Sequence, residues 1–428
     1  MNKADAARQD TGAGSIVMSR IASLAFALVT APLLARSLGP EGRGVAASLL
    51  AALALAPLFL GFGIPMAVRR QAAGGAAEDV LRASRTLIWP MGFVAVGLGA
   101  GAALWLLPRY GAPVQLMFVV AMLTTPAFVW VLCDQSYLIV KGRYRNVAYL
   151  QLTQPGVNAL SIASGALLGR LTVEWALASY SIATICAALA SSLLAGVSVR
   201  GTRIAVTPLV REGLTYAGSQ LAEAAGNRLD QVLAVSIIGA TQAGYYAVAV
   251  AIAAIPVSFG HAIGAALFRD LASSGSRARG AQARALRLGM ISGVIVGGGL
   301  AALSSWAVPV VFGSEFRGAA PSVLLLLCSA PATVGGYVAT IALAAQNRGA
   351  EMTVAQALGL VVGIALLYIL GSRLGAIGAA AASVVGYWSA MAIAVARLRT
   401  SVRSLLLGTR DVRDLVGVLL GRRSRGLR

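Results

Sequence analysis

Long apolar runs, each bounded by a short polar stretch, recur along nearly the whole chain. A helix needs about 20 apolar residues to cross the hydrocarbon core of a bilayer, so runs of this length predict transmembrane helices. Hydrophobic residues make up 58% of the sequence and charged residues only 12%, which agrees with that interpretation. We expect an all-α polytopic membrane protein with twelve transmembrane helices at 15–35, 45–68, 86–107, 114–140, 147–168, 174–197, 213–238, 243–268, 287–311, 319–345, 352–371 and 376–397.

Positive charge is distributed unevenly among the segments that connect these spans. If the N-terminus is cytoplasmic, most of the 35 Lys and Arg residues lie on the cytoplasmic side. The opposite side then has only Arg36, Arg43, Arg109, Arg170, Arg317 and Arg373. Because basic loops stay in the cytoplasm, we expect a multi-pass protein of the bacterial cytoplasmic (inner) membrane with both termini inside. Contacts with membrane lipid then account for the net charge of +20, and we expect no nucleic-acid partner.

The sequence repeats itself at an offset of 200 residues. Residues 38–69 align with residues 238–269, so that Gly39 corresponds to Gly239 and Arg69 to Arg269. Six spans separate the two copies, and an even number of spans gives both halves the same orientation in the membrane. Such parallel repeats are related by an axis along the membrane normal.

The repeat predicts the organisation of the chain. We expect two parallel six-helix lobes around a central cleft, formed by residues 1–197 and 198–397. Residues 398–428 are a basic cytoplasmic tail. Apolar residues recur there at helical spacing, which is typical of an amphipathic helix on the membrane surface, although a disordered tail has the same composition.

Four polar side chains lie near the middle of the seventh span, namely Glu223, Asn227, Arg228 and Asp230. A charge at the bilayer centre costs at least about 2.5 kcal/mol unless it is sheltered, so charges in this position are informative. Helical spacing places Glu223, Asn227 and Asp230 on one face, with Arg228 toward its flank. We expect this face to contact a cavity or the other lobe rather than lipid.

Two further charges, Arg20 in the first span and Asp134 in the fourth, lie at similar depth from the cytoplasmic end. One interpretation is that Arg20 with Asp134, and Glu223 with Arg228, are buried ion pairs that hold helices together. The other interpretation is a transport role. An anionic headgroup such as a pyrophosphate would then bind along a path formed by Arg20, Arg228 and Asn227. A coupling proton or sodium ion would bind, or the carboxylates would form ion pairs, at Asp134, Glu223 and Asp230.

Few residues are suited to covalent chemistry or metal binding. His261 is the sole histidine, and we expect it to pack between helices. The three cysteines Cys133, Cys186 and Cys328 lie in apolar runs without C-x-x-C spacing. The sequence also lacks the G-x4-G-K-S/T phosphate-binding motif of nucleotide hydrolases. We therefore expect that the protein is not an enzyme and has no metal site or cofactor.

Three stretches resemble the bacterial polysaccharide transporter, or oligosaccharide flippase, family. The first, LLARSLGPEGRGVAASLLA at 33–51, contains the phrase A-R-x-L-G-P-E-x-x-G that is typical of the end of the first span in that family. The second combines Arg228 and Asp230 with the sequence GYYAVA that begins at Gly244. The basic loop KGRYRN at 141–146 is also similar. The family shares a superfamily with the multidrug and toxic-compound extruders.

The resemblance implies a two-lobed, alternating-access transporter. Members flip an oligosaccharide linked to polyprenyl pyrophosphate from the cytoplasmic to the outer leaflet, for export of cell-surface polysaccharide. A cationic cavity is typical of the family and agrees with Arg20 and Arg228. The resemblance further implies membrane lipid and a lipid-linked oligosaccharide as binding partners, a coupling proton or sodium ion, and a polysaccharide polymerase or glycosyltransferase as protein partners.

Two alternatives remain open on the sequence. A cation-coupled exporter of small drugs or metabolites would share the fold and use the same carboxylates, but would need a closed aromatic or acidic pocket. A non-transporting scaffold that recruits polysaccharide enzymes would be insensitive to neutralisation of the intramembrane charges. The lipid II flippases of the superfamily carry two additional C-terminal helices, whereas the basic tail here is too polar to span, so we do not expect that role.

Overall fold

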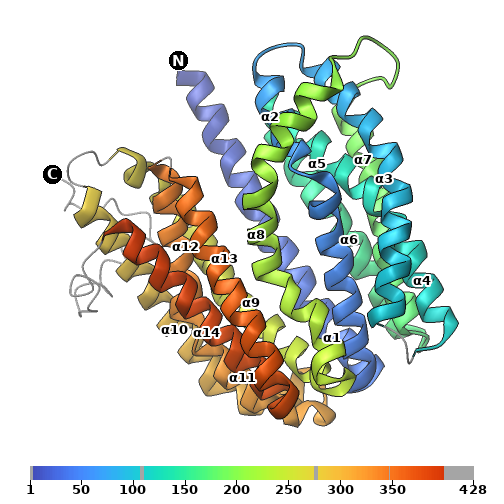
Figure 1. The fold of residues 1–428 in the computed structure, drawn as a ribbon, viewed down its shortest axis with the longest axis vertical. Helices are drawn as coiled ribbons and strands as arrows, with labels where there is room; N and C mark the ends of the chain where they lie inside the picture. The colour runs from blue at the N-terminus through green and yellow to red at the C-terminus, as the bar shows by residue number, and fades with distance from the viewer. Residues whose placement is uncertain (1–2, 107–109, 274–277, 347, 400–428) are drawn as a thin grey trace. The chain divides into compact units, whose positions relative to one another are not determined.

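The computed structural model describes residues 3–106, 110–273, 278–346 and 348–399 (Figure 1). Helices joined by short connections make up these residues, and no strand occurs among them. The chain divides into two compact units, Met1–Ser236 and Ile237–Arg428, which we describe separately. The predicted amphipathic tail lies outside the described residues from residue 400 onward. The expected lobe boundary at residues 197 and 198 remains a prediction.

The first unit is built from a sequence of long helices. In chain order they are α1 (Lys3–Gly61), α2 (Ile64–Ala73), α3 (Ala77–Leu106), α4 (Ala112–Met122), α5 (Thr125–Val140), α6 (Tyr144–Leu167), α7 (Val173–Ala195) and α8 (Val206–Ile238). The α8 helix ends two residues into the second unit. Gly39 has non-helical backbone angles (φ 65°, ψ 179°) and is followed by Pro40, so α1 consists of two arms. In Figure 1 the two arms run in opposite directions.

The core of the first unit lies around α5. This helix packs against α2, α3 and α7, while α6 packs against α1 and α7. Buried apolar side chains of α2, α3, α5, α6 and α7 fill the space between them. At the N-terminus of α7, Thr172 caps the helix by accepting a 3.2 Å hydrogen bond from the backbone N–H of Trp175. The Trp175 indole donates to the carbonyl of Ser161 at 2.9 Å and thereby joins α7 to α6.

The second unit contains another set of helices. They are α9 (Ala240–Ser273), α10 (Ala278–Phe312), the 3-10 helix η2 (Ser314–Ala319), α11 (Ala320–Leu327), α12 (Ala330–Ala345), α13 (Gly349–Leu366), the π-helical turn η3 (Leu367–Gly371) and α14 (Ser372–Leu398). Its core lies among α10, α12, α13 and α14. Small residues allow close helix contact: a Cβ atom at Gly293 of α10 would lie 2.5 Å from the carbonyl oxygen of Ala330 in α12.

The sequence repeat is visible in the backbone. Gly39 and its counterpart Gly239 have φ values of 65° and 80°, in the region that glycine adopts without steric cost. Each lies at a break between two helices, since Gly39 separates the arms of α1 and Gly239 separates α8 from α9. The glycines matched by sequence therefore have the same structural role in the two halves.

The helices are long and apolar enough for a membrane protein. Among the described residues, seven helices have the length and the apolar composition needed to cross a membrane. The number is eight if the bent pair Ser314–Leu327 and Ala330–Ala345 is one span. Two of the seven, with 44 and 50 residues, are about twice the length that a core of about 30 Å requires. Gly39 and Gly375 interrupt these two. The helices α6 and α8, with 24 and 33 residues, are also long enough to cross.

Each of the twelve predicted spans therefore falls on a helix or a helix pair, and the expectation of an all-α polytopic membrane protein is confirmed. The exposed surface agrees with it. Large apolar side chains point outward on several helices, including Phe93, Leu167 and Leu193 with more than four-fifths of their surface exposed. Such exposure is unfavourable in water and expected in lipid.

Candidate functional site

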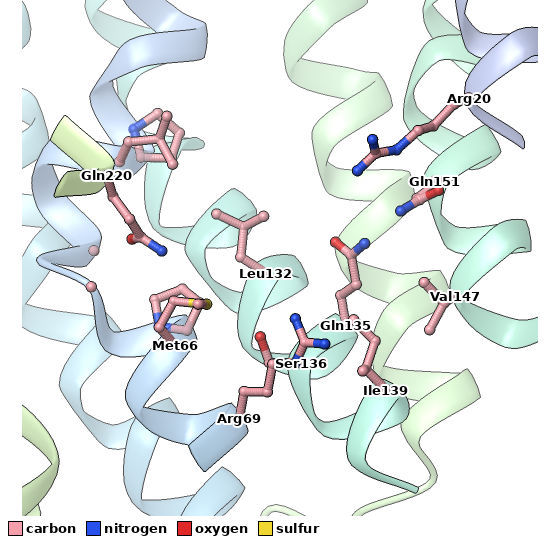
Figure 2. Close-up of a pocket in the computed structure, with 15 residues that line it drawn as sticks. Arg20, Met66, Arg69, Leu132, Gln135, Ser136, Ile139, Val147, Gln151 and Gln220 are labelled. Atoms are coloured by element: carbon pink, nitrogen blue, oxygen red, sulfur yellow. The ribbon is translucent and has the colours of Figure 1, made fainter. Parts of the chain in front are cut away.

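A pocket of about 370 Å³ lies within the first unit, among α1, α2, α5, α6 and α8 (Figure 2). We call it the arginine pocket. Apolar residues such as Leu58, Met66 and Leu132 form much of its wall. The polar side chains that line it are Arg20, Arg69, Gln135, Ser136, Gln151 and Gln220.

Positive charge dominates the arginine pocket. Arg20 comes from the first arm of α1 and Arg69 from α2, and both side chains are exposed. Within the described part of the chain, neither guanidinium makes a hydrogen bond or an ion pair, and no acidic residue lines the pocket. Two guanidinium groups without a carboxylate partner among the described residues attract an anion, and their planar donor arrays suit phosphate oxygens.

Amide side chains complete the polar lining. Gln135 lies on α5, Gln151 on α6 and Gln220 on α8, so three helices contribute one amide each. The Oε1 atom of Gln151 accepts a 2.7 Å hydrogen bond from the Ser19 hydroxyl. In Figure 2 its amide nitrogen points into the pocket, toward Gln135. Amides that are oriented in this way can bind hydroxyl, acetamido or phosphate groups.

The α2 and α8 helices are held together beside the pocket by a close backbone approach. Gly63, which lines the pocket, has a φ of 72°, and a Cβ atom there would lie 2.2 Å from the carbonyl oxygen of Gly213. About two turns further along α2, Arg70 pairs with Glu212 at 3.1 Å and donates to the Tyr216 hydroxyl at 2.9 Å. The Tyr216 hydrogen bond and the charge of Glu212 raise the pKa of the Arg70 guanidinium above its ordinary value. These contacts fix the wall that carries Gln220.

Asp134 has a different partner from the one that its depth suggested. Its carboxylate is fully buried and accepts 2.8 Å hydrogen bonds from Arg85 of α3 and Ser191 of α7. The Arg85 guanidinium also donates to the carbonyl of Val197 at 2.8 Å and lies 4.5 Å above the Trp130 ring. The Arg20–Asp134 ion pair, one of the two interpretations of these charges, is therefore not formed in the structure.

Helix rotation explains this difference. Successive residues on a helix point in directions about 100° apart, so Asp134 points toward α3 and α7 while its neighbours Gln135 and Ser136 face the arginine pocket. Arg20 lies on the pocket side. Equal depth in the membrane therefore did not bring the two charges together.

Three of the four charged or amide residues predicted in the seventh span, Asn227, Arg228 and Asp230, lie on α8 but do not line the arginine pocket. Asn227 and Arg228 are exposed, and Arg228 is close enough to Tyr180 of α7 for an electrostatic interaction. The Asp230 carboxylate is half-buried and accepts a 2.8 Å hydrogen bond from the backbone N–H of Gln231. The Glu223 side chain and His261 lie outside the described side chains, so their expected roles remain predictions.

Most of the arginine pocket escaped the sequence analysis. Of the predicted headgroup residues, Arg20 lines it, whereas Asn227 and Arg228 do not. Arg69 was not among the predicted site residues, although the sequence repeat matches that position with Arg269. Gln135 and Gln151 are polar residues within apolar runs, and that signal could have found them.

Solved structures with the same fold are membrane transporters. The lipid II flippase MurJ in an inward closed conformation has a TM-score of 0.73 at 12% identity, covering 96% of this chain and 93% of that one. An inward-facing multidrug resistance MATE transporter of the MOP superfamily has a TM-score of 0.68 at 13% identity, covering 94% and 99%. A MOP superfamily transporter from Pyrococcus furiosus, described as having a binding pocket of reverse polarity, has a TM-score of 0.57 at 12% identity, covering 96% of each chain. The fold is thus that of flippases and exporters.

The family follows from the sequence itself. Residues 11–268 match the model of the polysaccharide biosynthesis protein family, and the chain belongs to that family. A search of curated proteins gives no match. The resemblance found in the sequence is confirmed, and the protein is an integral membrane protein of a family and a fold of transporters.

Proposed function

We propose that the protein flips a lipid-linked oligosaccharide, carried on polyprenyl pyrophosphate, from the cytoplasmic to the outer leaflet by alternating access. The observation that carries this proposal is the arginine pocket, where Arg20 and Arg69 have no acidic neighbour among the described residues that line it. Membership of the polysaccharide biosynthesis family and the flippase-like fold support it.

The chemistry of the pocket fits such a substrate in two respects. A pyrophosphate carries several negative charges, and two guanidinium groups can bind its oxygens through charge-assisted hydrogen bonds. The amides of Gln135 and Gln220 match the hydroxyl and acetamido groups of sugars, while the apolar wall tolerates the start of a prenyl chain.

The place of the pocket in the unit fits the proposed direction. Arg69 is near the end of α2 and Val147 is near the start of α6, beside connections that the charge distribution assigns to the cytoplasm. Lipid-linked precursors of this kind carry their headgroup on that side before they are flipped. Both termini in the cytoplasm, ion coupling through Asp230 or Glu223, and a polymerase or glycosyltransferase partner remain predictions within this proposal.

The alternative, a cation-coupled exporter of small drugs or metabolites, draws on the likeness to MATE transporters. The pocket gives it less support. A cationic drug needs an acidic or aromatic lining, whereas the described residues that line the arginine pocket include two arginines and neither aromatic nor acidic residues. The carboxylate of Asp134 is already paired with Arg85.

The test is export of cell-surface polysaccharide from a strain that lacks the gene, complemented with wild type or variants. We expect Arg20→Ala and Arg69→Ala each to reduce export by about tenfold or more, since a hydrogen bond to a charged group contributes about 1.5–3 kcal/mol. Lipid-linked precursor should accumulate in parallel. Arg145→Ala is the matched control, because Arg145 is an exposed arginine of α6 outside the pocket.

Two results would contradict the proposal. Surface polysaccharide that is unchanged in the deletion strain would favour the drug exporter. Full export by the Arg20→Ala and Arg69→Ala variants, at wild-type protein levels, would remove the pocket from the mechanism and favour the scaffold.

A further inference from the structure

Ser19 precedes the pocket arginine Arg20 and contacts the opposite helix. Its side chain is buried, with 3% of its surface exposed, and its hydroxyl donates a 2.7 Å hydrogen bond to Oε1 of Gln151 on α6. A glutamine amide has an acceptor end and a donor end. Because Ser19 occupies the oxygen, the nitrogen points the other way, and Figure 2 shows it directed into the arginine pocket.

A second serine, Ser23, fixes the axial register between α1 and α6. The Ser23 hydroxyl, one turn along α1, lies 2.8 Å from the backbone carbonyl of Ser19 and 3.3 Å from that of Gln151. Two hydroxyl groups on adjacent turns of α1 therefore contact the same residue of α6. This arrangement holds Ser19 opposite the Gln151 side chain rather than one turn above or below it.

We propose that Ser19 is a positioning residue that locks Gln151 as a hydrogen-bond donor, so that the pocket presents donors from Arg20, Arg69 and Gln151 to one anionic group. This inference rests on the proposed function and specifies how the site recognises its substrate. An ionised pyrophosphate oxygen only accepts hydrogen bonds, and it matches a lining of this kind. A reversed amide would place its carbonyl oxygen against the phosphate and repel it.

The experiment is titration calorimetry of inorganic pyrophosphate with the full chain in detergent. Gln151→Met keeps the length of the side chain but removes the donor, and we expect about tenfold weaker binding. Ser19→Ala frees the amide to rotate, and we expect about threefold weaker binding. If Ser19 acts through Gln151, the double variant should bind no more weakly than Gln151→Met alone. Ser19→Thr, which keeps the hydroxyl, should restore binding, and a thermal unfolding scan of each variant shows that it is folded.

The outcomes separate this inference from the proposed function. Wild type that binds no pyrophosphate, or an Arg20→Ala variant that binds as well as wild type, would overturn the headgroup site and this inference together. Binding that is weakened by Arg20→Ala but unchanged in the Gln151→Met and Ser19→Ala variants would overturn this inference alone. Equal losses from Ser19→Ala in both Gln151 backgrounds would assign Ser19 a purely structural role.

Discussion

Replacement of Asp134 by asparagine tests whether this carboxylate is structural or serves ion coupling. Asp134 and Arg85 are 0% and 3% exposed, so the substitution leaves a buried guanidinium without its counter-charge. Loss of one member of a buried ion pair costs about 3–5 kcal/mol. Arg85 keeps the Val197 carbonyl at 2.8 Å and the Trp130 ring at 4.5 Å, which favours the lower end of that range. For a unit of this size, about 3 kcal/mol corresponds to a fall in Tm of roughly 6–12 °C.

The assay combines thermal unfolding of the purified protein, followed by tryptophan fluorescence, with the export measurement. The double variant Arg85→Met with Asp134→Leu replaces both charges by apolar groups, and its Tm should return to within a few degrees of wild type because such exchanges are often neutral. If the pair is structural, export should return with stability. A double variant that is stable but does not export would show that Asp134 has a transport role, and an unchanged Tm for Asp134→Asn would refute the energetic reasoning.

Two further substitutions probe the backbone arrangement. Gly63→Ala should lower the Tm by several degrees, since the new Cβ would lie 2.2 Å from the Gly213 carbonyl oxygen at a φ of 72°. The control Gly75→Ala, at a φ of 116° but with no atom near the new Cβ, should lower the Tm less. Equal effects of the two substitutions would show that backbone strain, and not the contact with Gly213, determines the loss of stability. Gln242→Ala should destabilise by about 1–3 kcal/mol, because its Oε1 accepts from the backbone N–H of Ala376 at 3.0 Å beside the break at Gly375; a Tm equal to that of wild type would contradict this.

The helices were predictable because lipid imposes a simple rule on the sequence. Every backbone polar group within the membrane must be satisfied internally, so each apolar run of sufficient length becomes a helix. The breaks were also visible, since Gly39 and Gly239 stood out through the repeat and both have positive φ values. The helices and their approximate bounds could therefore be predicted from short stretches of the sequence.

The site was less predictable because it depends on helix rotation and on contacts between distant segments. The position of a residue within its span predicts its depth in the membrane, and on this basis Arg20 and Asp134 lie at the same depth. The packing of α5 against α3 and α7 determines which side of α5 faces the pocket. Arg85 of α3 and Ser191 of α7 bind the Asp134 carboxylate and so turn it away from the pocket. Gln151 could have been noticed as polar, but its orientation depends on Ser19, 132 residues away in the sequence.

The contacts of α8 bear on the order in which the chain acquires its structure during synthesis. The Ser48 hydroxyl donates to the Gln231 carbonyl at 2.6 Å, and the Gly63–Gly213 approach and the Arg70–Glu212 pair anchor the same helix to earlier segments. Because the ribosome delivers the N-terminal part first, these anchors can form once residue 236 has emerged, before the second unit exists. A half-length fragment for separate expression should therefore end at Ser236, since one ending at residue 197 would leave Arg70 without Glu212 and Gly63 without its neighbouring helix.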